Sequence, residues 1–467
     1  MPTAVVALLL SQAAHATPFV VPHLGGPVFV GPVDAHVTAM YWNPAAMGLL
    51  QGTHYYLSAT GRLDWTQVER ATIDTGSGEP AADGDKSFSP VSLVPLTVDN
   101  FAGAIFEISN DATFGLAVYS PFAENLTSDQ ALAYHASGGL FYTETFSVGL
   151  AYRVEPWLIF GVTVNLLFSK LHLQFDRDTA LDGCTATPCS QHIETAANAE
   201  HYDLDAPLFE FPSIDVSFGL ILRLGDWTVG ASAANFFNAL ARNTVSLVGD
   251  AHVTTAASAT PTPTATLDGK TTINFNLPAT VDLGVRRRVF KDLDLVVGAR
   301  WTHLGTQNKL DLRLYGKALT AATIPDWIVR ERGLDDVYWV EAGLELPPAQ
   351  AFRWGVRARV STGGVPEELV AIDQLDAPSL DLSAGVEVRL STRVAVTGGY
   401  TLSLLAPRDV SDSAFSPSAR IACNAASFDI TLPACVAVRD GRGIPTAAGR
   451  YLRVGNALTL GLNIDIW

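Results

Sequence analysis

The sequence predicts an all-β protein, a fourteen-stranded antiparallel transmembrane β-barrel with an N-terminal hatch, or plug. Its 467 residues are 48% hydrophobic and their mean hydropathy is +0.21, yet past the first residues no apolar run is long enough for a transmembrane helix. A membrane protein without such helices must form a closed barrel of strands, because in the hydrocarbon of the bilayer an unpaired backbone group finds no hydrogen-bond partner. Fourteen period-two segments follow residue 53, and their connections alternate between short and long.

The N-terminus reads as a leader followed by the plug. Residues 1–16 contain an apolar core, Ala4 to Leu10, and end in a small-x-small cleavage signal, although the basic start of a secretory signal is missing. We expect a signal peptide with an atypical start, and a short buried strand is the alternative. The expected domains are then the signal peptide (1–16), the plug (17–53) and a barrel (54–467) in the outer membrane of a Gram-negative bacterium.

The plug is predicted from VDAHVTAMYWNPAAMGLLQG, residues 33–52. At its centre lie Trp42, Asn43, Pro44 and Ala45. Proline lacks a backbone donor and pushes the preceding residue out of the α region, so the chain has to turn inside an apolar segment. An ordinary Asn-Pro turn is the alternative.

Charge is confined to one face of the expected strands, as a polar lumen requires. In 379–390, for example, Leu380 to Leu390 share an apolar parity, and Asp381 to Arg389 share a polar one. An arginine facing lipid at mid-membrane costs roughly 2–4 kcal/mol. A soluble sandwich or lipocalin-like barrel is the alternative. The expected strands are 54–66, 91–108, 112–120, 138–153, 157–175, 210–224, 227–238, 272–289, 293–314, 336–346, 352–362, 379–390, 394–406 and 451–466.

Several arginines fall on the lumenal parity and are candidate partners for the carboxylate of a ligand. The alternative is that they pair with Glu341, Glu345 and Glu387 and fill the lumen with salt bridges. These arginines are Arg286, Arg300, Arg353, Arg357 and Arg359.

The remaining composition excludes several function classes. The cysteines form two close pairs, Cys184 with Cys189 and Cys423 with Cys435, which favours disulfides in an oxidising compartment over free thiols and lacks metal-site spacing. A net charge of −17 argues against a nucleic-acid partner. No GxSxG, HExxH, P-loop or EF-hand motif is present, so we expect no enzyme, cofactor or metal site. An outer-membrane lipase is the alternative, without a motif that points to it.

Several segments carry a family resemblance. The plug resembles the N-terminal hatch of the FadL/TodX outer-membrane transporters, whose Asn-Pro-Ala motif is here Asn43-Pro44-Ala45. Residues 114–122, FGLAVYSPF, and 276–285, NLPATVDLGV, resemble two of the family's strands. Residues 337–343, 380–385 and 399–401 follow its C-terminal hairpins.

The resemblance implies a monomer, surrounded by outer-membrane lipid and lipopolysaccharide, that passively takes up hydrophobic compounds past a hatch. The compounds implied are long-chain fatty acids or aromatic or aliphatic hydrocarbons. It also implies a landing site on the long loops 176–209 and 239–271 and a sideways exit near 110–122. In the first loop the candidate landing residues are Leu204, Leu208, Phe209 and Phe211. A general diffusion porin and a structural or adhesive barrel are the alternatives, and a porin has no use for a plug.

Overall fold

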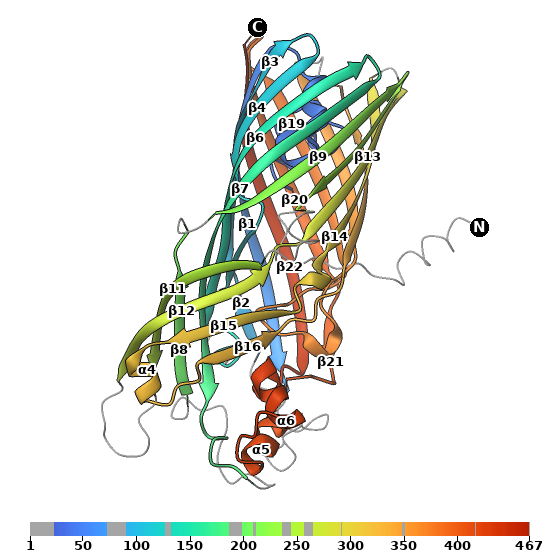
Figure 1. Cartoon of the computed structure of the whole chain (residues 1–467). Helices are drawn as coiled ribbons and strands as arrows, with labels where there is room; N and C mark the ends of the chain where they lie inside the picture. The colour runs from blue at the N-terminus through green and yellow to red at the C-terminus, as the bar shows by residue number, and fades with distance from the viewer. Residues whose placement is uncertain are drawn as a thin grey trace, which may run out of the picture.

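The computed structural model shows a tall antiparallel barrel with residues 23–52 inside it (Figure 1). It describes residues 23–71, 90–126, 132–185, 199–208, 212–235, 244–255, 265–290, 292–347, 351–415 and 417–466. The expected signal peptide, 1–16, lies outside the described residues. Within them, no helix is long and apolar enough to span a membrane.

Fourteen of the described strands form a closed ring, as the sequence predicts. The ring closes where β22 pairs with β1, from Thr53 opposite Ile466 to Arg70 opposite Gly449. In ring order the strands are β1 (Thr53–Arg70), β3 (Leu96–Ser109), β4 (Ala112–Tyr119), β6 (Gly138–Glu155), β7 (Leu158–Asp178), β9 (Ser213–Leu224), β10 (Trp227–Ala234), β13 (Ala279–Phe290), β14 (Leu293–His303), β17 (Val337–Glu345), β18 (Phe352–Ser361), β19 (Ser379–Arg389), β20 (Val394–Leu405) and β22 (Gly449–Ile466).

The two rims of the barrel differ. Short turns lie at the rim that carries the C-terminus, and the long connections extend from the opposite rim, here called the outer rim (Figure 1). Along β17 and β18 buried and exposed residues alternate without exception. The exposed ones, such as Val340 and Val356, are apolar, whereas Glu341 and Arg357 are buried. An apolar outer face around a polar lumen fits a barrel in lipid.

The strand β7 shows where this lipid-facing surface ends. Its outward side chains are apolar from Phe160 to Phe168 and polar or charged from Lys170 to Asp176. Its inward side chains change in the opposite sense, because polar Thr163, Asn165 and Ser169 lie there among apolar residues, whereas Leu171, Leu173 and Phe175 beyond them are all apolar and buried. Above the membrane the sheet therefore follows the rule of soluble proteins, with apolar side chains inside.

Eight further strands build the outer part. The strands β8, β11, β12, β15 and β16 continue the sheet outward from β7, one after another, and enclose an outer hydrophobic core. The outer strands are β2 (Val91–Leu93), β5 (Ala123–Leu126), β8 (Ala199–Ala206), β11 (Thr244–Thr254), β12 (Thr266–Asn276), β15 (Lys309–Tyr315), β16 (Trp327–Glu331) and β21 (Arg408–Val410).

The expected strand 91–108 is interrupted at Val94 and Pro95, between β2 and β3. Two further expected strands are wrong. The segment 272–289 is divided between β12 and β13 at Leu277 and Pro278, because proline cannot donate to the ladder. The segment 293–314 is divided between β14 and β15 by a short 3-10 helix, η4 (Leu304–Thr306). In both cases one half belongs to the membrane barrel and the other to the outer sheet.

The helices are short. Inside the barrel lie α2 (Ala39–Trp42) and the 3-10 helix η1 (Pro44–Leu49). On the outer side lie α4 (Lys317–Ala321), η5 (Glu367–Leu369), α5 (Ser418–Ala425), α6 (Pro433–Ala437) and the irregular turn η6 (Val438–Arg442).

Candidate functional site

Residues 23–52, here called the N-terminal segment, occupy the barrel lumen. Its apolar side chains, among them Met40 and Met47, pack with wall residues such as Phe101, Ile159 and Ile221 in one buried cluster. The segment makes no strand of its own, and its regular structure consists of the short helices α2 and η1. The channel is therefore filled at this level by protein.

The Asn-Pro turn is the point where the segment is fixed to the wall. Asn43 is fully buried and extended, with φ −164° and ψ 102°, as a residue before proline prefers. Its side-chain Nδ2 donates to the carbonyl oxygens of Pro32 at 2.7 Å and Leu220 at 3.1 Å, and its Oδ1 accepts from the Ala45 backbone N–H. One amide thus joins two parts of the segment to β9.

Glycines in the wall make room for the segment. A Cβ added at Gly161 would lie 2.2 Å from the Ala45 nitrogen, and one at Gly219 would lie 2.1 Å from Asn43 Oδ1. Several of these glycines are direct neighbours in the register, for example Gly161 with Gly219. The glycine belt comprises Gly103, Gly115, Gly149, Gly161, Gly219, Gly230, Gly284, Gly355, Gly385 and Gly399, whose added Cβ atoms would all approach the segment to 3.1 Å or less.

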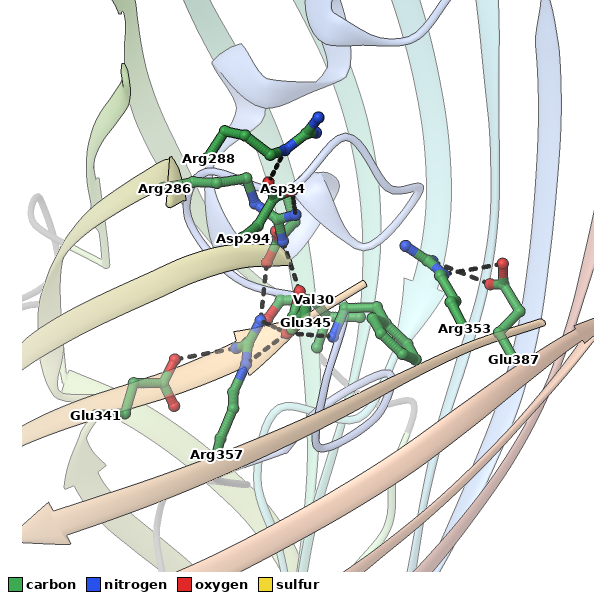
Figure 2. A network of polar contacts seen from close by, with 11 residues as sticks. Val30, Asp34, Arg286, Arg288, Asp294, Glu341, Glu345, Arg353, Arg357 and Glu387 are labelled. Carbon is green, nitrogen blue, oxygen red and sulfur yellow. Dashed lines mark hydrogen bonds and ion pairs between the residues drawn. The ribbon is translucent and has the colours of Figure 1, made fainter. Parts of the chain in front are cut away.

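Charged side chains of β13, β17 and β18 also hold the segment (Figure 2). Asp34 of the segment pairs with Arg286 of β13 and lies 3.2 Å from Nη2 of Arg357 on β18. The Arg357 Nη1 also donates to the Val30 carbonyl at 2.7 Å, and the Phe29 N–H donates to Glu345 at 2.9 Å. A carboxylate and two backbone groups of the segment are therefore bound to the wall.

The network continues along the strands. Arg357 pairs with Glu345 at 2.5 Å and with Glu341 at 3.0 Å, and Arg359 pairs with the same Glu341 at 2.8 Å. Arg353 lies apart, bidentate to Glu387, with both N–O distances 3.0 Å (Figure 2). Charge pairing of this kind is what makes buried arginines tolerable.

Arg300 forms a second, separate anchor. It is fully buried and bidentate to Asp282, at 2.7 and 3.0 Å. Its guanidinium donates to the Tyr41 hydroxyl at 2.9 Å and lies 4.6 Å from the ring centroid of Trp42 and 5.8 Å from that of Trp339. This cation–π contact holds the residue before Asn43 against the wall.

All five predicted lumenal arginines therefore lie in the lumen, and each is paired with a carboxylate. Three of the acidic partners, Asp34, Asp282 and Asp294, were missed from the sequence. The role of these arginines as partners of a ligand carboxylate stays a prediction. Among the described residues no group of three or more His, Cys, Asp or Glu side chains is placed to hold a metal ion.

The structure describes two of the four predicted landing residues, Leu204 and Leu208. Leu204 is fully buried in the outer core, and Leu208 is partly buried just after β8. Phe209, Phe211 and Cys189 lie outside the described residues, so the Cys184–Cys189 pair does too. The other predicted disulfide, Cys423–Cys435, is present, with a Cα–Cα distance of 4.7 Å.

The outer part encloses a cavity of about 440 Å³ that was not predicted. Residues far apart in the sequence line it, from β6 and β7 through β15 and β16 to the segment 417–444, here called the cap. Most of the wall is apolar, with Phe141, Phe175 and Trp327 as examples. Apolar walls of this size suit a small hydrophobic ligand.

A buried carboxyl group lies in the wall of this cavity. Glu124 is on β5, opposite Phe141 and thus beyond the lipid-facing part of the barrel. Burial raises its pKa to about 7, although the cationic Arg453, Arg62 and Arg332 oppose this. The folded state therefore binds a proton at Glu124 more tightly than the unfolded chain does.

We expect Glu124 to make the outer core sensitive to pH. Because its pKa is raised on folding, its stabilising contribution is complete below about pH 4.5 and is lost as pH rises through about 7, on the order of 3 kcal/mol in all. Amide exchange in β5 should accelerate between pH 5 and pH 8.5 once intrinsic exchange rates are divided out. In Glu124→Gln this extra acceleration should disappear, and its persistence would assign the effect to another group.

Comparison with known proteins places these features in context. The family model described as outer membrane protein transport protein (OMPP1/FadL/TodX) matches residues 30–330. Among curated protein sequences none matches the chain.

Solved structures share the fold. A FadL homologue of Pseudomonas aeruginosa is 13% identical, with a TM-score of 0.68, and the match covers 96% of this chain and 99% of that one. The toluene transporter TodX of Pseudomonas putida is 12% identical, with a TM-score of 0.64 and coverage of 97% and 100%. The toluene transporter TbuX of Ralstonia pickettii is 14% identical, with a TM-score of 0.56 and coverage of 96% and 100%.

Proposed function

Because the chain belongs to the outer membrane protein transport protein family (OMPP1/FadL/TodX), we propose that it takes up hydrophobic compounds through a barrel gated by its N-terminal segment. The observation that carries this proposal is the filled lumen. A segment that is bound through Asn43, Asp34 and the glycine belt blocks water-filled passage, as a diffusion porin would not. The family consists of transport proteins, and we assign the chain no catalytic role.

The substrate class follows from the outer cavity and from the relatives. Two of the similar solved structures are toluene transporters, and the cavity wall here is rich in aromatic side chains. An apolar solute gains about 25 cal/mol for each Å² of apolar area removed from water. Monoaromatic hydrocarbons and fatty acids are therefore the substrates to test, with no partner subunit required.

The proposal is tested by changing the turn that fixes the segment. In Asn43→Ala three hydrogen bonds of the turn are lost, and we expect uptake of radiolabelled toluene and oleate by cells to fall severalfold while the barrel still assembles, as judged by heat-modifiable gel mobility. Asn456→Ala is the matched control, because Asn456 lies on the outer surface of the barrel, where its side chain accepts a hydrogen bond from the Tyr400 hydroxyl. It should transport normally.

Deletion of residues 17–52 gives the second arm. It should raise leakage of small polar solutes, because it removes the filling of the lumen. If the deletion left both hydrophobic uptake and leakage unchanged, gating by this segment would be wrong. If wild-type protein carried polar solutes and neither toluene nor oleate, the chain would be a diffusion porin instead.

A further inference from the structure

The cap contributes one wall of the outer cavity and also its most exposed apolar side chains. The Cys423–Cys435 disulfide joins α5 to α6 and fixes the ends of the loop 427–432 between them. Both cysteines line the cavity, as do Phe428 and Ile430 of the loop. Phe428 is nevertheless 49% exposed and Ile430 76% exposed. Side chains that face both the cavity and water lie at its mouth.

The loop holds these two side chains in place at a conformational cost. Ser427 and Phe428 both have a φ of 57°, in the left-handed region that non-glycine residues rarely adopt. The Asp429 carboxylate accepts hydrogen bonds from the Thr431 N–H at 2.9 Å and from its hydroxyl at 2.7 Å, which defines the turn. In residues 427–432 apolar side chains alternate with polar ones, so the turn fixes the positions at which Phe428 and Ile430 are exposed.

The cap is far from the lipid-facing surface. The helices α5 and α6 lie at the end of the molecule opposite the C-terminal rim (Figure 1). The cap is bound to β16, because Arg442 is bidentate to Glu331 at 2.8 and 3.0 Å and the Arg439 guanidinium lies 4.7 Å from the ring centroid of Trp327. Insertion into the membrane therefore does not explain the exposed Phe428 and Ile430.

We propose that Phe428 and Ile430 form the outer capture site, where an apolar compound is taken from water and passed into the cavity. The occupant is the transported hydrophobic molecule itself, because the two side chains are continuous with the cavity wall. The inference rests on the proposed function. It places the capture residues on the cap and not on the loop 176–209.

The test measures how the initial rate of toluene uptake depends on toluene concentration, in cells that make the full chain. In the double variant Phe428→Ser, Ile430→Ser we expect the half-saturating concentration to rise about tenfold with little change in the maximal rate, because capture is lost and the passage remains. The matched control is Leu432→Ser. Leu432 is 40% exposed on the same loop but does not line the cavity, and the variant should behave as wild type.

Three outcomes overturn the capture site. They are an unchanged half-saturating concentration in the double variant, an equal rise in Leu432→Ser, and a fall in maximal rate alone. The conservative pair Phe428→Leu, Ile430→Val should retain wild-type kinetics, and its failure to do so would likewise refute capture by apolar contact. Wild-type cells that show no saturable uptake of toluene or oleate would instead overturn the proposed function, and the capture site with it.

Discussion

Replacing Gly161 by alanine is expected to raise the resting conductance of the channel more than any other single-methyl change in the wall. The new Cβ would lie 2.2 Å from the Ala45 nitrogen and 2.3 Å from the Pro44 carbonyl carbon. Both are backbone atoms, so no side-chain rotation can relieve the contact, and the N-terminal segment must move. A cost of about 2 kcal/mol raises the ratio of displaced to bound N-terminal segment roughly thirtyfold. Conductance of purified protein in planar bilayers measures the opening.

The control for this substitution is Gly398→Ala. Gly398 is next to Gly399 of the glycine belt, but it points to the other face of β20, and a Cβ there would have no neighbour within 4 Å. It should conduct as wild type does. Equal conductance of Gly161→Ala and wild type would mean that the segment is not held against β7 in the membrane.

The second large effect is expected from Arg357→Met. This substitution removes the cation that Asp34, Glu341 and Glu345 share. Removing one partner of a buried ion pair costs about 3–5 kcal/mol, and we expect the lower end of this range because Arg286 and Arg359 still pair with these carboxylates. The N-terminal segment should lose its bound position in the lumen, and the temperature at which the barrel changes gel mobility should fall. Arg450→Met is the control, because Arg450 and Asp409 are 58% and 73% exposed and such pairs contribute little.

A double variant separates charge from packing. In Arg357→Met, Glu345→Gln one carboxylate that has lost Arg357 and keeps only Arg286, at 2.6 Å, is neutralised, so part of the lost stability should return. If the double variant is less stable than Arg357→Met by the full effect of Glu345→Gln alone, the two residues act independently and the network does not hold the segment.

The sequence predicts the membrane part of the fold well, because lipid and lumen impose opposite demands on alternate residues. The strand expected over 379–390 is β19, Ser379–Arg389. The period of two continues above the membrane, but there the apolar parity turns inward, as β7 shows. Periodicity alone cannot detect this reversal, and the strands expected over 272–289 and 293–314 therefore ran across it.

The site is less predictable for a related reason. Parity places Arg300 and Arg357 in the lumen, but their partners Asp282 and Asp34 depend on how the N-terminal segment lies there. The outer cavity brings Phe141, Trp327 and Phe428 together from three distant parts of the chain. One signal was available, since glycines such as Gly284, Gly355 and Gly385 recur on the lumenal parity, where the wall comes close to the N-terminal segment.

The glycine belt also has a consequence for how such channels diverge. A wall that fits its N-terminal segment at the level of single methyl groups constrains both partners, because a bulkier residue in the segment needs a smaller wall residue opposite it. Mutations in the two should therefore be accepted in pairs, so that an N-terminal segment transplanted from a distant relative fits only together with its own set of wall glycines.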